Sequence, residues 1–283
     1  MSLPQLLSHG WLGLALLAWI ALSVGSFLNV VVYRLPVMLQ REWRAQASEI
    51  LGVAAVSDAE PPFNLMVPRS RCPGCGTQIS ARHNVPVLSW LFLRGRCAHC
   101  ATPISARYPL VEILTAAASL AVVATYGYTW LGLAALGFTW AIIALTFIDF
   151  DTKLLPDQIT LPLLWSGLIV NLLGGFTDIT SSLIGAIAGY LALWSIYWAF
   201  KLITKKEGMG YGDFKLLGAL GAWFGWQALP MLVLISSFVG ILLGGTYLMV
   251  QRSRDPIPFG PYLAIAGWVT LLAHDRVIAV VFG

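Results

Sequence analysis

Two aspartates, Asp149 and Asp213, lie where apolar segments of the sequence meet polar ones. Asp149 ends the run "WAIIALTFID", and Asp213 follows "GMGYG" and opens another apolar run. Two carboxylates at close range share one proton, because like charges a few ångströms apart cannot both ionise cheaply. The protonated carboxyl can then donate to a carbonyl oxygen while the ionised one activates water. If the two side chains meet, the pair predicts aspartic peptidase chemistry.

Asp151 competes with Asp149 for the first position of this pair. The two are about 200° apart around a helix, so both cannot face one partner unless the helix has unwound. We favour Asp149 because it lies deeper in the apolar run. Asp213 could instead only cap a helix. Helix dipoles favour an ionised Asp213 at a helix N-terminus and a protonated Asp149 at a helix C-terminus.

Three alternating glycines, Gly208, Gly210 and Gly212, precede Asp213. They would let the backbone approach a substrate closely or act as a hinge, or they form only a flexible connector. Four further acids have simpler interpretations. We expect Asp157 and Asp178 to cap helices, Glu112 to lie in the first turn of a helix, and Glu207 to lie in a solvated loop.

All four cysteines lie in two Cys-x-x-Cys pairs, Cys72 with Cys75 and Cys97 with Cys100. This spacing is typical of a structural zinc site, in which four thiolates close the shell and leave no position for a catalytic water. Neighbouring arginines should favour the thiolate form. A redox pair or unrelated free thiols would be the alternative, and His83 or His99 could replace a cysteine as ligand.

The composition indicates what must position these groups. The chain is 58% hydrophobic and 11% charged, with a mean hydropathy of +0.78, whereas soluble domains are about 25% charged. The apolar segments are apolar on every side, which favours a helical bundle over a β-barrel. We predict an all-α polytopic membrane protein in a lipid bilayer, with about eight spans near residues 11–33, 108–126, 129–148, 160–175, 180–201, 213–228, 229–250 and 258–273.

The basic residues predict the orientation. With alternate loops on one side, every lysine and arginine except Arg276 falls on that side, which the positive-inside rule assigns to the cytoplasm. A cleaved signal peptide is the alternative for the first span, but no basic residue precedes it. The net charge of +4 is explained by topology, so no nucleic-acid partner is implied. The oligomeric state is not indicated.

We therefore expect three parts: a first transmembrane helix (1–33), a small cytoplasmic zinc domain (34–107) and a seven-helix transmembrane domain (108–283). The segment 34–107 is too small to be stabilised by burial of apolar side chains alone, so it needs a bound metal ion to hold its fold.

Six stretches carry a resemblance to a known family: "GSFLNVVVYRLP", the tetracysteine loop, "RYPLVE", "IDFDTKLLPDQIT", "GMGYGDFKLL" and "PFGPYLA". In this order they resemble the type IV prepilin leader peptidases almost from end to end. The resemblance implies a GxGD-type intramembrane aspartic peptidase of the bacterial inner membrane, with Asp149 and Asp213 catalytic at the cytoplasmic face. It also implies prepilin and pseudopilin substrates, and N-methylation of the new terminus from S-adenosylmethionine.

Two other classes remain as alternatives. A proton-coupled transporter would place carboxylates near the bilayer midplane and would have two similar halves, and we find no internal repeat. A membrane scaffold would use the zinc domain only to bind partners.

Overall fold

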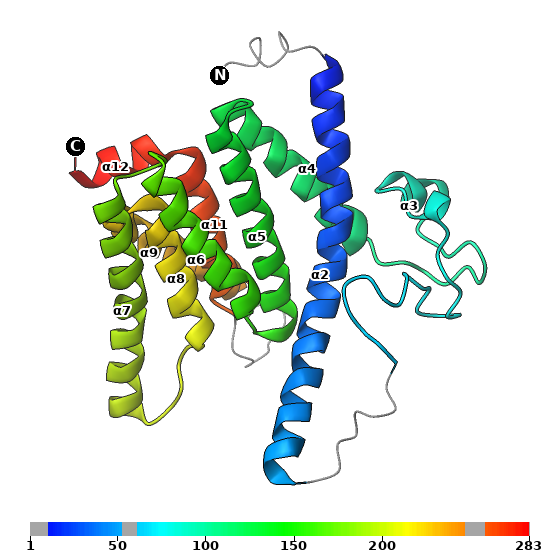
Figure 1. Ribbon diagram of the computed structural model, residues 1–283, viewed down its shortest axis with the longest axis horizontal. Helices are drawn as coiled ribbons and strands as arrows, with labels where there is room; N and C mark the ends of the chain where they lie inside the picture. The colour runs from blue at the N-terminus through cyan, green and yellow to red at the C-terminus, as the bar shows by residue number, and fades with distance from the viewer. Residues whose placement is uncertain (1–10, 53–60, 247–257, 283) are drawn as a thin grey trace. The chain divides into compact units, whose positions relative to one another are not determined.

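The computed structural model describes residues 11–52, 61–246 and 258–282, and within them the chain is helical, with two isolated β-bridges and no β-strand (Figure 1). The chain forms two compact units, residues 1–124 and 125–283. The predicted all-α fold class is confirmed.

The first unit begins with one long helix, α2 (Trp11–Leu51). The helix continues 18 residues beyond the predicted end at residue 33 and passes through Pro36. The polarity of the sequence changes at Arg34, but glutamine, arginine, glutamate and alanine form helix readily, so the change in polarity does not end the helix. The sequence boundary between membrane helix and polar segment is therefore not a boundary of secondary structure.

The rest of the first unit contains η2 (Ala81–His83), α3 (Leu88–Phe92) and most of α4 (Arg107–Tyr126). α4 packs closely on α2 at Gly25, where a Cβ would lie 2.7 Å from the Glu112 Cα. The Asn29 side chain joins the same two helices by donating to the Tyr108 carbonyl oxygen at 3.1 Å.

The second unit is a helical bundle (Figure 1). Its helices follow in the order α5 (Trp130–Thr152), α6 (Asp157–Leu172), α7 (Ile179–Thr204), α8 (Tyr211–Phe224), η3 (Trp226–Ala228), α9 (Leu229–Val239), η4 (Gly240–Gly244), α11 (Gly260–Leu272) and α12 (His274–Phe282). α8 is the most buried of them, with every residue from Leu216 to Phe224 in the core.

Small residues and one polar side chain hold α8 in place. A Cβ on Gly221 would lie 2.1 Å from the Gly185 carbonyl oxygen, so α7 and α8 are in backbone contact. The Asn171 amide, at the end of α6, donates to the Ala222 carbonyl oxygen at 2.7 Å. Close helix contact through small residues is typical of membrane bundles.

Among the described residues, five helical segments are long and apolar enough to cross a membrane: Trp11–Leu51, Arg107–Tyr126, Trp130–Thr152, Ile179–Thr204 and Trp226–Gly244. The predicted spans near 160–175, 213–228 and 258–273 correspond to shorter helices of 16, 14 and 13 residues. The number of spans, eight, stays a prediction. The C-terminal helix α12 was not predicted.

The structural roles expected for the remaining acids are partly wrong. Asp178 does cap α7, since its Oδ1 accepts from the Ser181 amide at 2.9 Å. Asp157 does not cap α6, because Pro156 occupies that position and the Asp157 carboxylate instead pairs with Lys215 on α8 at 2.7 Å. Asp157 thus joins two helices of the bundle.

Glu112 is the sixth residue of α4, so it lies beyond the first turn and the expected position was wrong. Its side chain is buried and accepts a hydrogen bond from the Val87 amide at 2.7 Å. Glu112 therefore fastens the loop before α3 to α4 rather than complementing a helix dipole.

Candidate active site and metal centre

The two aspartates singled out in the sequence lie together in the second unit. Asp149 is in the last turn of α5 and is 4% exposed, and Asp213 is in the first turn of α8 and is 6% exposed. The two carboxylates are close enough to interact electrostatically. Buried carboxylates are costly to ionise without a cation partner. The arrangement is therefore a buried carboxyl pair at the ends of two helices.

Local backbone features place both groups at these helix ends. α5 ends at Lys153, which adopts the left-handed conformation with φ of 55° and donates its amide to the Asp149 carbonyl oxygen at 2.8 Å. Gly210 occupies the cap position of α8, and its carbonyl oxygen accepts from the Asp213 amide at 3.2 Å. Asp213 therefore lies at the positive end of a helix dipole, as expected.

Gly260, the first residue of α11, borders the pair and was given no role from the sequence. A Cβ on Gly260 would lie 2.5 Å from Asp149 Oδ2 and 3.1 Å from Leu155 Cδ1. Asp149 Oδ2 is buried and has no hydrogen-bond partner among the residues that the structure describes. This carboxylate oxygen can therefore still accept a hydrogen bond.

Asp151 is exposed, two residues beyond the buried Asp149. The choice of Asp149 for the first position assumes such a difference in depth, and its catalytic role stays a prediction.

The three glycines before Asp213 are in different surroundings. A Cβ on Gly212 would lie 2.6 Å from Leu155 Cβ, and one on Gly210 would lie 3.7 Å from Asp213 Oδ2. Gly208 is farther back, where a Cβ would meet the Phe200 ring at 2.8 Å. None of the three has positive φ. At Gly212 close packing, rather than an unusual backbone conformation, requires glycine.

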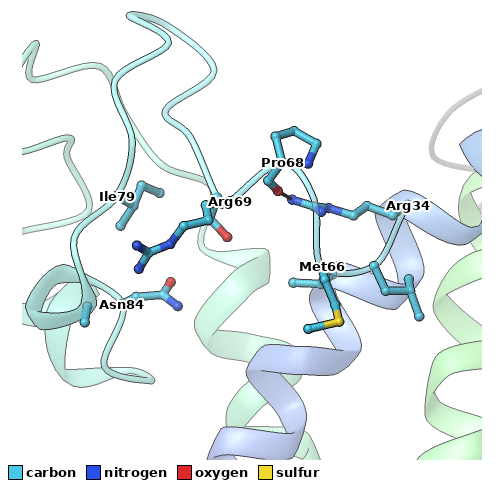
Figure 2. Close-up of a pocket in the computed structure, with 10 residues that line it drawn as sticks. Arg34, Met66, Pro68, Arg69, Ile79 and Asn84 are labelled. Carbon is cyan, nitrogen blue, oxygen red and sulfur yellow. Dashed lines mark hydrogen bonds between the residues drawn. The ribbon is translucent and has the colours of Figure 1, made fainter. Parts of the chain in front are cut away.

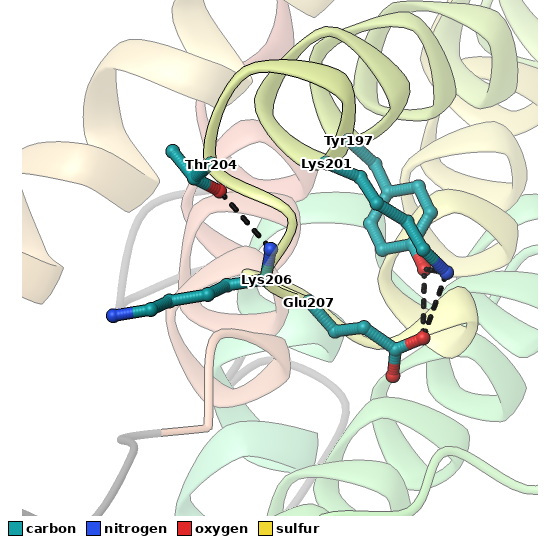
Figure 3. A network of polar contacts seen from close by, with 5 residues as sticks. All are labelled: Tyr197, Lys201, Thr204, Lys206 and Glu207. Carbon is teal, nitrogen blue, oxygen red and sulfur yellow. Dashed lines mark hydrogen bonds and ion pairs between the residues drawn. The ribbon is translucent and has the colours of Figure 1, made fainter.

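A polar network fastens the start of this glycine segment to α7 (Figure 3). Lys201 Nζ donates to Glu207 Oε1 at 2.8 Å and to the Tyr197 hydroxyl at 3.0 Å. The Tyr197 ring also packs on Phe214, next to Asp213, with centroids 5.5 Å apart. Glu207 is therefore paired with a lysine, although its side chain is 70% exposed as expected for a loop.

The four cysteines of the first unit come together. The sulfur atoms of Cys72, Cys75, Cys97 and Cys100 all lie within 4.8 Å of one another, and those of Cys72 and Cys100 are 3.7 Å apart. Four thiols at this range could hold a metal ion. Neither His83 nor His99 is part of the group.

The cluster is built from a short repeat that the sequence interpretation missed. Residues 71–82, "RCPGCGTQISAR", and 96–107, "RCAHCATPISAR", share the pattern R-C-x-x-C-x-T-x-I-S-A-R. The two copies fold alike: the Cys72 amide donates to the Thr77 carbonyl oxygen, and the Cys97 amide to the Thr102 carbonyl oxygen, both at 2.9 Å. Each repeat therefore supplies one knuckle with two sulfur atoms.

Hydrogen bonds favour the thiolate form at Cys97 and Cys100, whereas the pKa of Cys72 is raised to about 11, with burial and the neighbouring Cys97 and Cys75 thiols raising it. The Thr102 hydroxyl and backbone amide lower the pKa of Cys100 to about 6. The backbone amides of Cys100 and His99 lower the pKa of Cys97. A pKa of about 6 leaves Cys100 mostly ionised at neutral pH, which is the form that binds a metal.

Comparison with known proteins assigns both units to one family. The chain matches the model of the bacterial peptidase A24 N-terminal domain over residues 19–126 and that of the type IV leader peptidase family over residues 135–245. No solved structure matches the chain.

Curated relatives match nearly the whole chain. Proteins named prepilin leader peptidase/N-methyltransferase are 58% identical in Aeromonas hydrophila, over 98% of this chain and 97% of the relative, and 50% identical in Pseudomonas aeruginosa, over 91% and 89%. An identity of this size over this length is sufficient to assign the family. The chain belongs to the type IV leader peptidase family.

Proposed function

We propose that this protein is a membrane aspartic endopeptidase that removes the basic leader from type IV prepilins and related pseudopilins, and then N-methylates the new terminus. Its relatives are named for both activities. The observation that carries the peptidase assignment is the buried pair of Asp149 and Asp213, in which one oxygen, Asp149 Oδ2, has no hydrogen-bond partner among the described residues.

In the proposed reaction the ionised Asp213 takes a proton from a water molecule, which attacks the carbonyl carbon of the scissile peptide. The protonated Asp149 donates to the carbonyl oxygen as negative charge develops there. Collapse of the tetrahedral intermediate breaks the C–N bond as the proton held by Asp213 passes to the leaving amine, and one hydroxyl proton of the intermediate returns to Asp149. The assignment of charge follows from the positions of the two groups at opposite helix termini.

The glycines support this reaction by their size. Gly212 on α8 lies against Leu155, and Gly260 on α11 lies against Asp149 and Leu155. Because neither glycine has a side chain, the backbone of both helices can approach the carboxyl pair closely. A substrate in extended conformation needs such access to a site at the end of apolar helices. We assign to Gly208 and Gly210 only a structural role: they shape the loop that leads to Asp213.

We further propose that the cysteine cluster holds a structural zinc ion. Ligands about 2.3 Å from zinc in a tetrahedron lie about 3.8 Å from one another. The separation of 3.7 Å between the sulfur atoms of Cys72 and Cys100 fits this value. Four thiolates close the coordination shell, so the ion would hold the two knuckles together and take no part in hydrolysis.

Methyl transfer needs different groups from peptide cleavage. S-adenosylmethionine, when bound, supplies an electrophilic methyl group, and the acceptor is an α-amine with a pKa of roughly 7.7–8.0. Because a usable fraction of this amine is neutral near pH 7, alignment and desolvation can provide most of the catalysis. We therefore assign no role in methyl transfer to Asp149 or Asp213.

The direct test is reconstitution of the purified protein in lipid vesicles with a prepilin and S-adenosylmethionine. Mass spectrometry should detect loss of the leader and a gain of one methyl group on the new N-terminus. Intact prepilin after prolonged incubation with folded protein would reject the peptidase assignment. Cleaved but unmethylated pilin would reject only the second activity.

We expect Gly260→Ala to reduce cleavage strongly while the protein remains folded. The added methyl group would lie 2.5 Å from Asp149 Oδ2, so the carboxyl must move by about 1 Å, and displacements of this size can cost about 100-fold in rate. Gly137→Ala on α5 is the matched control, because nothing lies within 4 Å of a Cβ there. Equal cleavage rates for the two variants would remove Gly260 from the site.

The proposed location is the bacterial inner membrane, with the aspartates at the cytoplasmic face. Single cysteines introduced into a version without the native ones should be labelled from the cytoplasm at Ala55 and Thr204 and from outside at Thr177. This pattern follows from the distribution of lysine and arginine. The reverse pattern would contradict the orientation.

A further inference from the structure

The short helix α3 in the first unit turns its apolar side chains outward and its polar side chain inward. Leu88, Leu91 and Phe92 are 45%, 56% and 84% exposed, and we call them the α3 apolar face. Ser89 is buried, and its hydroxyl oxygen accepts from the Val85 amide at 2.9 Å. A surface helix of a domain in water has the opposite arrangement, with apolar residues toward the core. The α3 apolar face is therefore built for an apolar surrounding.

Two contacts place the start of α3 beside the apolar parts of α2 and α4. The Val87 amide donates to Glu112 at 2.7 Å, and the Glu112 Cα lies 2.7 Å from the position of a Cβ on Gly25. Gly25 is nine residues, or about 13 Å of helix, before Arg34, the first basic residue of α2. Glu112 is five residues, or about 7 Å, beyond Arg107, where α4 begins. In Figure 1, α3 is level with the N-terminal half of α2. Val87 therefore lies on the apolar side of both charged positions.

The segment of residues 64–68 marks the level at which α2 changes from apolar to polar (Figure 2). Arg34 is 8% exposed and donates to the Asn64 carbonyl oxygen at 2.8 Å and to the Pro68 carbonyl oxygen. Arg34 and Met66 both line the pocket drawn in Figure 2, and the Met66 side chain is 84% exposed. A large apolar side chain is thus exposed at this level too.

The charges around α3 are of one sign. Residues 61–106 contain five arginines and no aspartate or glutamate. Arg82, Arg94 and Arg96, which flank α3, are exposed, and none of the three forms an ion pair within the described residues. Arginine side chains are long enough to reach lipid headgroups from a backbone that lies below them. An apolar face with flanking cations is complementary to the acyl chains and anionic headgroups of phospholipids.

We propose that α3 lies in the cytoplasmic leaflet of the bilayer, where its apolar face contacts acyl chains and the three flanking arginines bind the phosphate groups of anionic phospholipids. The inference goes beyond the proposed function and requires only that α2 crosses the bilayer. The uncharged run "VPVLSWLFL" (85–93) is too short to span a membrane, so it enters and leaves on the same side. Cys97 follows Phe92 by five residues, so this insertion anchors the cysteine cluster at the membrane surface.

Photo-cross-linking of the full-length protein, with all four cysteines kept, tests the contact with lipid. Phe92 is replaced by p-benzoylphenylalanine, and the protein is illuminated without prepilin in nanodiscs of phosphatidylcholine and phosphatidylglycerol. Mass spectrometry should detect a phospholipid joined to position 92. Leu91, replaced in the same way, should give the same product and serves if the change at position 92 prevents folding. Trp43 is the matched control, because it is 48% exposed but lies nine residues beyond Arg34, and it should give no lipid adduct.

Three results would overturn the proposal. A photoproduct joined to residues 125–283 or to a second copy of the chain, instead of to lipid, would show that protein covers the α3 apolar face. The absence of lipid adducts at both positions 91 and 92 would show that the face does not reach the bilayer. Equal lipid adducts at positions 43 and 92 would show that depth along α2 does not decide the contact. A protein without peptidase or methyltransferase activity would give the same adducts, so the proposed function is tested separately.

The double variant Arg94→Gln with Arg96→Gln tests the headgroup contact. With the photoreactive residue at position 92, phosphatidylglycerol should form about five times its bilayer share of the adducts, the factor expected for one arginine near an anionic surface. The double variant should lower this enrichment toward the bilayer share, whereas Arg44→Gln, an exposed arginine on the polar part of α2, should leave it unchanged. A metal content equal to that of the wild type verifies the fold around the cysteines. Adducts that match the bilayer composition in the wild type would overturn the assignment of the arginines.

Discussion

Asp213→Asn is expected to abolish leader cleavage, with a loss of about 10³-fold or more, while the protein still inserts and folds. An amide cannot take the proton from water, and in the proposed mechanism no other group near Asp149 can replace it. The side chain is 6% exposed and its shape is retained, so the fold should tolerate the change. Asp149→Asn should have a similar effect, because the protonated partner is then lost.

Asp151→Asn is the matched control for this experiment. Asp151 is exposed and two residues from the buried Asp149, so its replacement should alter cleavage only slightly. The rate is measured as leader release from a prepilin in lipid vesicles. Normal cleavage by Asp149→Asn together with loss of cleavage by Asp151→Asn would contradict the assignment of the first aspartate.

The same Asp213→Asn protein should still methylate a synthetic pilin peptide that begins at the mature residue. This result is expected because the proposed methyl transfer needs alignment and desolvation of the amine rather than a carboxyl pair. A folded Asp213→Asn protein that failed on the pre-cleaved peptide would show that the two reactions share groups.

Replacing Cys72 and Cys75 together by serine is expected to remove the metal and to decrease methylation. Structural zinc sites in small peptides contribute about 10–16 kcal/mol of apparent binding free energy, so their loss unfolds the segments they join. Zinc content should fall from about one ion per chain to near zero. Methylation should decrease at least as much as cleavage, since we expect the first unit to help form the site for the methyl donor.

His99→Ala provides the control for metal binding. His99 lies between two cysteines but only its backbone amide contacts the cluster, donating to the Cys97 sulfur at 3.4 Å. Metal content, measured by mass spectrometry of purified protein, should be unchanged in this variant. A protein that contains no zinc as isolated, with all four thiols open to alkylation, would refute the zinc assignment.

The class of fold and the clustering of the four cysteines could be predicted from local sequence because each depends on short-range physics. Long apolar segments must form helices in a membrane, and two Cys-x-x-Cys pairs must form knuckles before they can share an ion. Helix ends were less predictable. α2 continues past the change in polarity at Arg34, because helix formation depends on helix propensity and backbone hydrogen bonding. An apolar run indicates only whether a segment is surrounded by lipid or by water.

The pairing of Asp149 with Asp213 was predicted from matching positions at helix ends, and the structure brings the two together. The neighbours of the pair were not predictable. Gly260 and Leu155 reach it through the packing of α11 and the loop after α5, which are distant in sequence from Asp213. The repeat around the cysteines is present in the sequence, but it joins two short segments, 71–82 and 96–107, rather than two halves of the chain.

By itself, the sequence determined an all-helical membrane protein, a four-cysteine cluster and two aspartates at the ends of apolar helices, because each depends on residue type and near-neighbour spacing. Only the tertiary structure decided that Asp149 rather than Asp151 is buried, that Glu112 fastens a loop, and that Arg34 holds the segment before the cysteines against α2. These features depend on which helices and loops pack together, and burial and hydrogen-bond partners are properties of that packing rather than of any segment alone.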